Sequence, residues 1–109
     1  MKLVQSILTK NPCCKAGKKI AVKGLMLHSV GCSQPKASVF INSWNRASYS
    51  RACVHAFIDG NDGTVYQTLP WNHRGWHAGG SANNTHIGVE MCEPACIRYT
   101  SGSGFTVSK

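Results

Sequence analysis

A dense turn signal between two strand-like runs constrains the fold of this chain more than any other feature. Residues 59–63 read DGNDG, and the largely apolar runs at residues 54–58 and 64–69 flank them. Glycine, asparagine and aspartate are favoured in tight turns, because they adopt backbone conformations that most residues avoid. The sequence therefore predicts a β-hairpin at this place.

One amphipathic helix accompanies the hairpin. Ala37, Phe40, Ile41 and Trp44 recur at helical spacing, which predicts a helix over about residues 35–46.

The remaining segments predict a mixed α/β domain built on a four-stranded sheet. The strands of this sheet are expected near residues 22–30, 53–59, 64–69 and 86–92. Outside the sheet we expect a short helix or turn at residues 5–9, a polar loop at residues 12–19 and a short strand at residues 105–107. A sheet needs cover on its apolar faces, so a single helix is thin cover for four strands.

Basic residues dominate the N-terminal half. The net charge of +8 comes from 12 Lys and Arg against 4 Asp and Glu, and no acidic residue precedes Asp59. A basic face attracts polyanions. Nucleic acid and the anionic bacterial cell wall are both candidate partners, and a surface that only aids solubility is the third interpretation.

The sequence shows neither a membrane span nor a secretory signal. No apolar run approaches the roughly 20 residues that cross a bilayer, and Lys10 interrupts the N-terminal segment early. We therefore expect synthesis in the cytoplasm, with a phage-type release if the protein acts outside the cell. For the six cysteines we expect free thiols, because disulfides are rare in reducing compartments.

His28 and Glu90 are the strongest candidates for chemistry. His28 follows an apolar run and precedes a turn, so it lies at a strand end, where active-site groups or structural histidines are found. Glu90 interrupts an apolar strand; if it is buried, it must be paired, metal-bound or protonated, and at a sheet edge it would face solvent. Together, a histidine ligand and a carboxylate base suit a metal-activated water.

The other histidines carry weaker signals. His77 lies beside Trp76 in a glycine-rich loop, where backbone can approach a ligand closely, and both residues are predicted to contact substrate. His55 lies inside an expected strand and is predicted to be a structural core residue. His73 and His86 are predicted to lie on the surface.

Four segments in this order resemble the zinc-dependent N-acetylmuramoyl-L-alanine amidases, a family that includes phage lysozyme-type amidases and peptidoglycan recognition proteins. The matching segments read GLMLHS (24–29), VHAFID with NDGTVYQ (54–59 and 61–67), WHAGG (76–80) and NTHIGVE (84–90). They extend over about residues 20–93, most of the chain. The resemblance implies a central mixed β-sheet flanked by helices, with zinc in a groove on one face.

The resemblance also implies roles for individual residues. His28 matches the first zinc ligand, and Glu90 matches the catalytic acid of the glutamate-bearing branch. Val54 occupies the place of a tyrosine that other relatives use. His77 matches a loop residue of the substrate groove, beside Trp76. The implied reaction is hydrolysis of the amide between N-acetylmuramic acid and L-alanine, with peptidoglycan or muropeptides as partner and no nucleic acid.

Two further zinc ligands of the family have no counterpart here. They are a histidine and then an Asp or Cys well downstream of the Glu90 strand, whereas no histidine follows His86 and no acidic residue follows Glu93. We therefore expect residues 1–109 to form one amidase-like catalytic domain that is incomplete at its C-terminus. A zinc amidase acting on the cell wall is the first hypothesis, and a non-catalytic peptidoglycan-binding module or inactive fragment is the alternative. A basic nucleic-acid binder ranks last.

Overall fold

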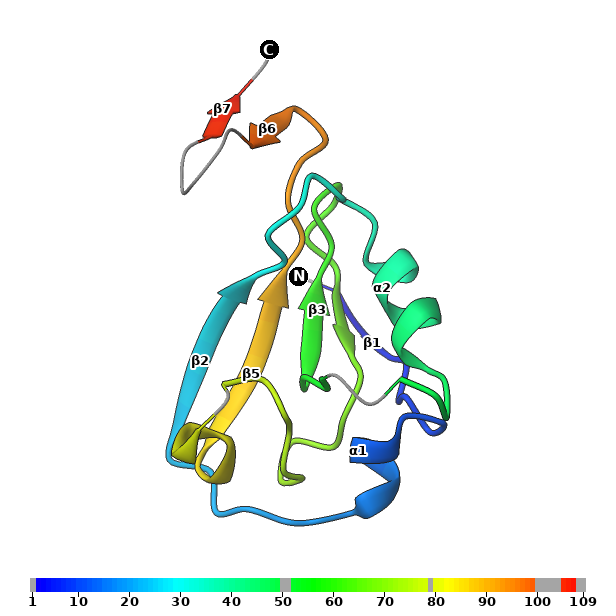
Figure 1. The fold of residues 1–109 in the computed structure, drawn as a ribbon, viewed down its shortest axis with the longest axis vertical. Helices are drawn as coiled ribbons and strands as arrows, with labels where there is room; N and C mark the ends of the chain where they lie inside the picture. The colour runs from blue at the N-terminus through cyan, green and yellow to red at the C-terminus, as the bar shows by residue number, and fades with distance from the viewer. Residues whose placement is uncertain (1, 50–51, 79, 100–104, 108–109) are drawn as a thin grey trace.

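A five-stranded sheet forms the centre of the computed structural model, which describes residues 2–49, 52–78, 80–99 and 105–107. The strand order is β1-β4-β3-β5-β2 (Figure 1). Its strands are β1 (Leu3–Gln5), β2 (Gly24–Ser29), β3 (Ala56–Ile58), β4 (Val65–Gln67) and β5 (His86–Met91). Only β3 and β4 pair antiparallel; the other neighbours pair parallel, so the sheet is mixed, as predicted.

The predicted hairpin is present between β3 and β4. Ile58 pairs with Val65 across the turn, and Gly63 adopts a φ of +74°, a conformation that favours glycine. The Asp59 carboxylate accepts hydrogen bonds from the amides of Asn61 and Ala37, at 2.9 and 2.8 Å. Asp59 therefore links the hairpin turn to the first residue of the helical layer that packs on the sheet.

That layer is α2 (Ala37–Trp44), which confirms the predicted helix. Phe57 of β3 is fully buried; it stacks on Phe40 at a ring-centroid distance of 5.5 Å and meets the edge of Trp44 at 4.9 Å. Ala37 and Val54 complete the buried centre of this core. One face of the sheet is thus covered beside β3.

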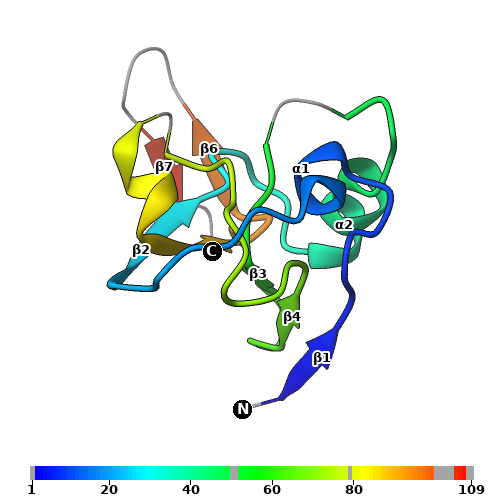
Figure 2. The same ribbon diagram turned by 90° about the horizontal axis from the view of Figure 1, so that it is seen from below.

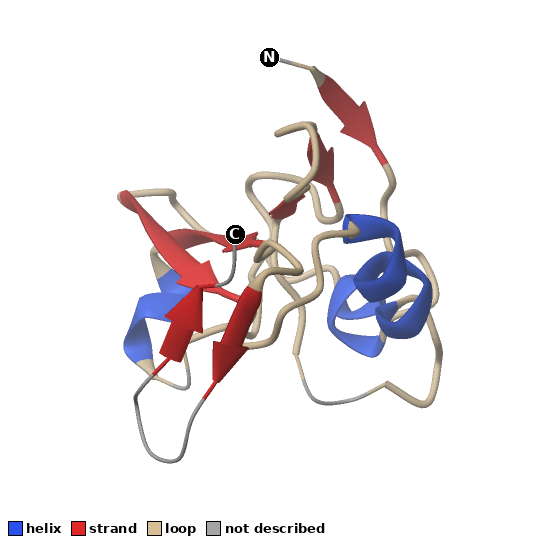
Figure 3. Cartoon of the chain, turned by 90° about the horizontal axis from the view of Figure 1, so that it is seen from above, coloured by secondary structure: helices blue, strands red, loops and turns tan. Residues whose placement is uncertain are grey.

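The N-terminal expectations were wrong. Residues 5–9 form no helix: β1 extends the sheet through a parallel pairing with β4, and a turn begins only at Thr9. The expected loop at residues 12–19 begins with α1 (Pro12–Ala16), capped by Asn11 and ended by Gly17 at a φ of +63°. The two helices lie side by side at one side of the sheet (Figures 2 and 3), where the Asn11 side chain donates to the carbonyl of Trp44.

The expectation of free thiols was wrong for one pair of cysteines. Cys13 of α1 and Cys53, just before β3, form a disulfide across 40 residues of sequence. The other four cysteines are free. The pairing depends on the packing of α1 against the segment that precedes β3, which residue spacing alone does not reveal.

The edge of the sheet formed by β2 carries little cover. Leu25 and Leu27 are 58% and 56% exposed, in agreement with the expectation of thin cover. A separate hairpin of β6 (Ile97–Tyr99) and β7 (Phe105–Val107) lies beyond the end of β5 (Figure 1) and contains the strand predicted at residues 105–107. No helix of the described residues is long and apolar enough to cross a membrane.

Candidate active site

Strands β2 and β5 bring His28 and Glu90 together. The two residues are direct partners in the parallel register of these strands. Paired residues of neighbouring strands project from the same face, and successive residues alternate between faces. His28 and Glu90 therefore share one face, while exposed Leu27 points to the other.

Glu90 combines a buried carboxylate oxygen with a raised pKa. Its Oε2 atom is buried and has no hydrogen-bond partner among the described residues. Burial raises the pKa of Glu90 above the ordinary value of 4.5; His28 opposes the rise and Glu93 adds to it. A carboxylate with raised proton affinity and an unused oxygen is suited to accept a proton from water or substrate.

His77 stands beside this pair in a tightly defined position. Its Nδ1 lies 3.1 Å from Nε2 of His28, and its own Nε2 lies 3.1 Å from the carbonyl oxygen of His86. The buried Asn83 side chain accepts the amide hydrogen of His77 at 2.9 Å. The fold thus brings together three of the residues that the sequence singled out, His28, Glu90 and His77.

A glycine makes room for the His77 ring. A Cβ atom on Gly88 of β5 would lie 2.6 Å from both Cδ2 and Nδ1 of that ring, far closer than van der Waals contact allows. The ring therefore lies directly on the backbone of β5. Burial lowers the pKa of His77; the hydrogen bond to His86 opposes this, and the charges of His28 and His55 add to it.

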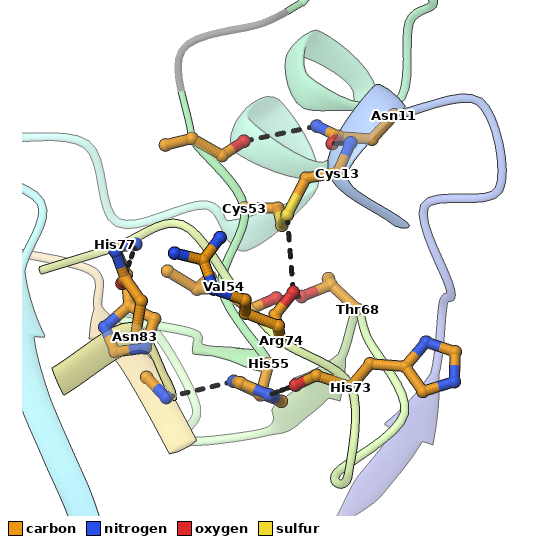
Figure 4. Close-up of a disulfide and its surroundings, with 12 residues drawn as sticks. Asn11, Cys13, Cys53, Val54, His55, Thr68, His73, Arg74, His77 and Asn83 are labelled. Atoms are coloured by element: carbon orange, nitrogen blue, oxygen red, sulfur yellow. Dashed lines mark hydrogen bonds between the residues drawn. A yellow bond between two sulfur atoms is a disulfide. The ribbon is translucent and has the colours of Figure 1, made fainter. Parts of the chain in front are cut away.

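His55 is a buried structural histidine, as predicted. It is 0% exposed, and its Nδ1 accepts the amide hydrogen of Gly88 at 3.0 Å. Its Nε2 donates to the carbonyl of His73 at 2.7 Å (Figure 4). Burial lowers the pKa of His55. His73 and His86, which were predicted to lie on the surface, are each partly exposed.

Trp76 lies at the mouth of a separate pocket. The pocket has a volume of about 260 Å³, and its lining includes Trp76, Tyr49, Lys18 and Arg74. Trp76 is 47% exposed, and the Arg74 guanidinium sits 5.0 Å from its ring centre. Mutual backbone hydrogen bonds to Cys53 hold Trp76 in place. This pocket combines an aromatic wall with two cations, and neither His28 nor Glu90 lines it.

Two residues of the site were missed by the sequence analysis. Asn83 accepts from the amides of both His77 and Ala78 and so shapes the loop. Glu93 is buried and accepts from the Ser29 hydroxyl and the Gly31 amide, just beyond the His28 end of β2. Glu93 is one of only four acidic residues, and this scarcity could have marked it as a candidate site residue. Asn83 has no such signal, because loop asparagines are common.

The donor chemistry at His28 fits zinc only in part. An imidazole beside a carboxylate is a common arrangement at zinc sites, but a catalytic zinc takes three protein ligands. Among the described residues, no group of three or more His, Cys, Asp or Glu side chains is placed to hold a metal ion. The described residues by themselves therefore do not form a complete zinc site.

Comparisons with known proteins agree with this arrangement. The sequence model of the N-acetylmuramoyl-L-alanine amidase family matches residues 18–107. Two curated amidases of Bacillus subtilis (strain 168) are similar in sequence. XlyA is 53% identical over 44 residues, and CwlH is 46% identical over 45 residues. Each alignment covers 38% of this chain, but only 14% of XlyA and 17% of CwlH.

Solved structures show the same fold. The catalytic domain of XlyA matches with a TM-score of 0.73 and 27% identity, over 87% of this chain and 63% of that one. A mutant endolysin from Bacillus subtilis matches with a TM-score of 0.70 and 26% identity, over 87% of this chain and 64% of that one. The chain thus spans less than two thirds of these solved relatives. Because the family model matches most of its length, the chain belongs to the N-acetylmuramoyl-L-alanine amidase family.

Proposed function

We propose that this chain supplies the general base and one zinc ligand for hydrolysis of the amide between N-acetylmuramic acid and L-alanine in peptidoglycan. The observation that carries the proposal is the register pairing of His28 with Glu90, whose buried Oε2 has no partner among the described residues. Membership of the amidase family supplies the substrate class. The site of action is then the bacterial cell wall.

Glu90 is the proposed base. Its carboxylate takes a proton from the attacking water and passes it to the departing amine nitrogen, as general acid–base catalysis requires. Its raised pKa favours this role, because a base of higher proton affinity accepts a proton more readily. Zinc, when bound, polarises the scissile carbonyl and lowers the pKa of water. His28 is the proposed ligand from this chain.

The pocket beside Trp76 is the proposed substrate contact. Peptidoglycan stems carry free carboxylates, which the cations of Lys18 and Arg74 would attract, and the exposed Trp76 ring offers an apolar surface for the remainder. His77, the residue after Trp76, contacts His28 and is the second proposed substrate contact. Among the described residues, no acidic side chain lines the pocket.

Binding without turnover is the second candidate function. It is favoured by one observation: the described residues hold no group of three metal-ligating side chains. A groove with Trp76, Lys18 and Arg74 would then recognise muropeptides without cleaving them.

Zinc stoichiometry and muropeptide cleavage, measured on the same purified sample, test these functions. Cleavage that requires zinc supports the amidase, whereas muropeptide binding without zinc and without cleavage supports the second candidate. In an active preparation, Glu90→Gln should abolish cleavage while zinc content stays unchanged, and His28→Ala should lose zinc. Asp62→Asn, in the exposed hairpin turn, is the matched carboxylate control. Normal cleavage by Glu90→Gln would refute the base assignment.

A further inference from the structure

The Cys13–Cys53 disulfide connects two walls of the pocket beside Trp76. Cys13 belongs to the wall formed by α1 and the residue before it, and the opposite wall includes Arg74 and Trp76. Cys53 is tied to Trp76 by two main-chain hydrogen bonds, in which each residue donates to the other, at 3.1 and 2.9 Å. Figure 4 shows the disulfide, with Sγ of Cys13 at 3.5 Å from the carbonyl oxygen of Arg74. One covalent bond therefore joins both walls.

The α1 helix depends on its attachments, because it is too short to be stable alone. It has five residues, none of them buried, and isolated helices shorter than about 12 residues are marginal in water. Before the helix, the Asn11 side chain donates to the carbonyls of Trp44 and Ala52, at 2.9 and 3.2 Å. After it, the carbonyl of Lys18 accepts from the amide of Arg74. The disulfide is the covalent attachment that starts within the helix, and its loss leaves this wall of the pocket held only at its ends by these bonds.

The disulfide is open to attack from one side. Cys13 is half-buried and lines the pocket, whereas Cys53 is 1% exposed, so a reductant in the pocket meets the sulfur of Cys13. Lys18 and Arg74 line the same pocket, and their charges attract an approaching thiolate.

Reduction by a dithiol balances as two exchange steps. One thiolate of the reductant attacks Sγ of Cys13, the S–S bond breaks, and Cys53 leaves as a thiolate that takes up a proton. The second thiolate of the reductant attacks the mixed disulfide and releases Cys13, which also takes up a proton. The reductant becomes a disulfide, and the chain gains two electrons and two protons. The other four cysteines are free, so the reagent breaks no other disulfide.

We infer that the Cys13–Cys53 disulfide is a redox switch for the pocket: the oxidised chain holds α1 against the segment of Cys53 and Trp76, and reduction releases this wall and weakens ligand binding. The inference rests on the proposed function for the ligand of the pocket, a muropeptide, and adds regulation to it. Disulfides persist in oxidising surroundings and are reduced by the thiol pools of the cytosol. The pocket is therefore complete under oxidising conditions and loosened under reducing ones.

Amide order parameters of the ¹⁵N-labelled full chain test the switch without a ligand. In the oxidised chain the Lys15 amide, which donates to the Asn11 carbonyl at 3.0 Å, should show an order parameter of about 0.85, and reduction by dithiothreitol should lower it below about 0.6. The Gly88 amide, which donates to buried His55 in the sheet, is the internal control and should stay at about 0.85. An unchanged value at Lys15 would overturn the inference. Unfolding of the whole chain on reduction would also overturn it, because the bond would then support the entire fold and not one wall.

Calorimetric titration with N-acetylmuramoyl-L-alanyl-D-isoglutamine, a small muropeptide, tests binding. We expect an affinity about 10-fold weaker in the reduced chain, because only a minor fraction of it keeps the wall in place, and recovery on reoxidation. Cys53→Ala removes the bond without changing a residue that lines the pocket, and it should bind weakly with or without reductant. Cys14→Ser replaces the neighbouring free cysteine and is the matched control, which should respond like the unmodified chain.

Two outcomes of the titration separate the switch from the proposed function. Equal affinity in the oxidised and reduced chains would overturn the inference. Absence of muropeptide binding in both states, together with the loss of order at Lys15 on reduction, would refute the pocket as the substrate contact and still support the switch.

Discussion

Replacement of His55 should destabilise the fold through two buried hydrogen bonds. In His55→Ala, the amide of Gly88 and the carbonyl of His73 both lose their partner inside the protein. Each buried polar group left without a partner costs about 1–3 kcal/mol, so we expect a loss of about 4 kcal/mol in the free energy of unfolding. This is a large part of the 5–15 kcal/mol typical of a domain.

His55→Asn is the matched variant. The asparagine oxygen occupies the position of Nδ1 and can accept from Gly88, but nothing replaces the donor to His73. We therefore expect about half the loss seen in His55→Ala, measured by urea unfolding monitored by tryptophan fluorescence at pH 7.5. A cost below about 1 kcal/mol for His55→Ala would refute the bridging role, because it is less than one such bond.

The same histidine predicts a pH dependence. Its pKa in the folded protein is lowered from 6.5, so the unfolded chain binds the proton first as pH falls. The contribution to stability is complete above about pH 6.5 and declines below it, by at most about 1.4 kcal/mol per pH unit for each such histidine. His77 shifts in the same direction. The slope of the free energy of unfolding against pH should be smaller in His55→Asn than in the unmodified protein. Equal slopes in these two proteins would contradict the assignment of this pH dependence to His55.

Four further predictions address other parts of the molecule. Reduction of the Cys13–Cys53 disulfide should lower the free energy of unfolding by up to about 4 kcal/mol, because the bond closes a loop of 40 residues. A thiol titration of the unreduced, denatured chain should find four thiols, and six thiols would exclude the bond. Gly88→Ala should displace the His77 ring from β5, with a cost of about 1–3 kcal/mol seen in thermal unfolding. Asp59→Ala should cost about 1–2 kcal/mol in urea unfolding, because it removes the acceptor for three main-chain amides, and Asp59→Asn should cost less. If Glu90 is the base, cleavage by an active preparation should rise with pH through a pKa above 4.5, and a rise centred at or below 4.5 would argue against its burial.

Features with a local cause were predictable from the sequence. The DGNDG turn, the helical spacing in α2 and the position of His28 at the end of an apolar run all depend on neighbouring residues. The α1 helix also had a local signal that the sequence analysis did not use, namely Asn11 before Pro12 and Gly17 at the end. The strand that contains Glu90 was likewise expected from its apolar residues, whereas its pairing with the His28 strand is a finding of the structure.

Only the tertiary structure decided the contacts between distant segments. β1 becomes a strand because β4, about 60 residues later, offers it an edge, and three residues have no strand signal strong enough to predict this. The Cys13–Cys53 bond and the contact between His28 and His77 likewise join elements that are 40 and 49 residues apart. The sequence by itself determines which residues are polar, flexible or turn-forming. Whether His77 meets His28 depends on the packing of the His77 ring against Gly88, and packing is a property of the folded chain.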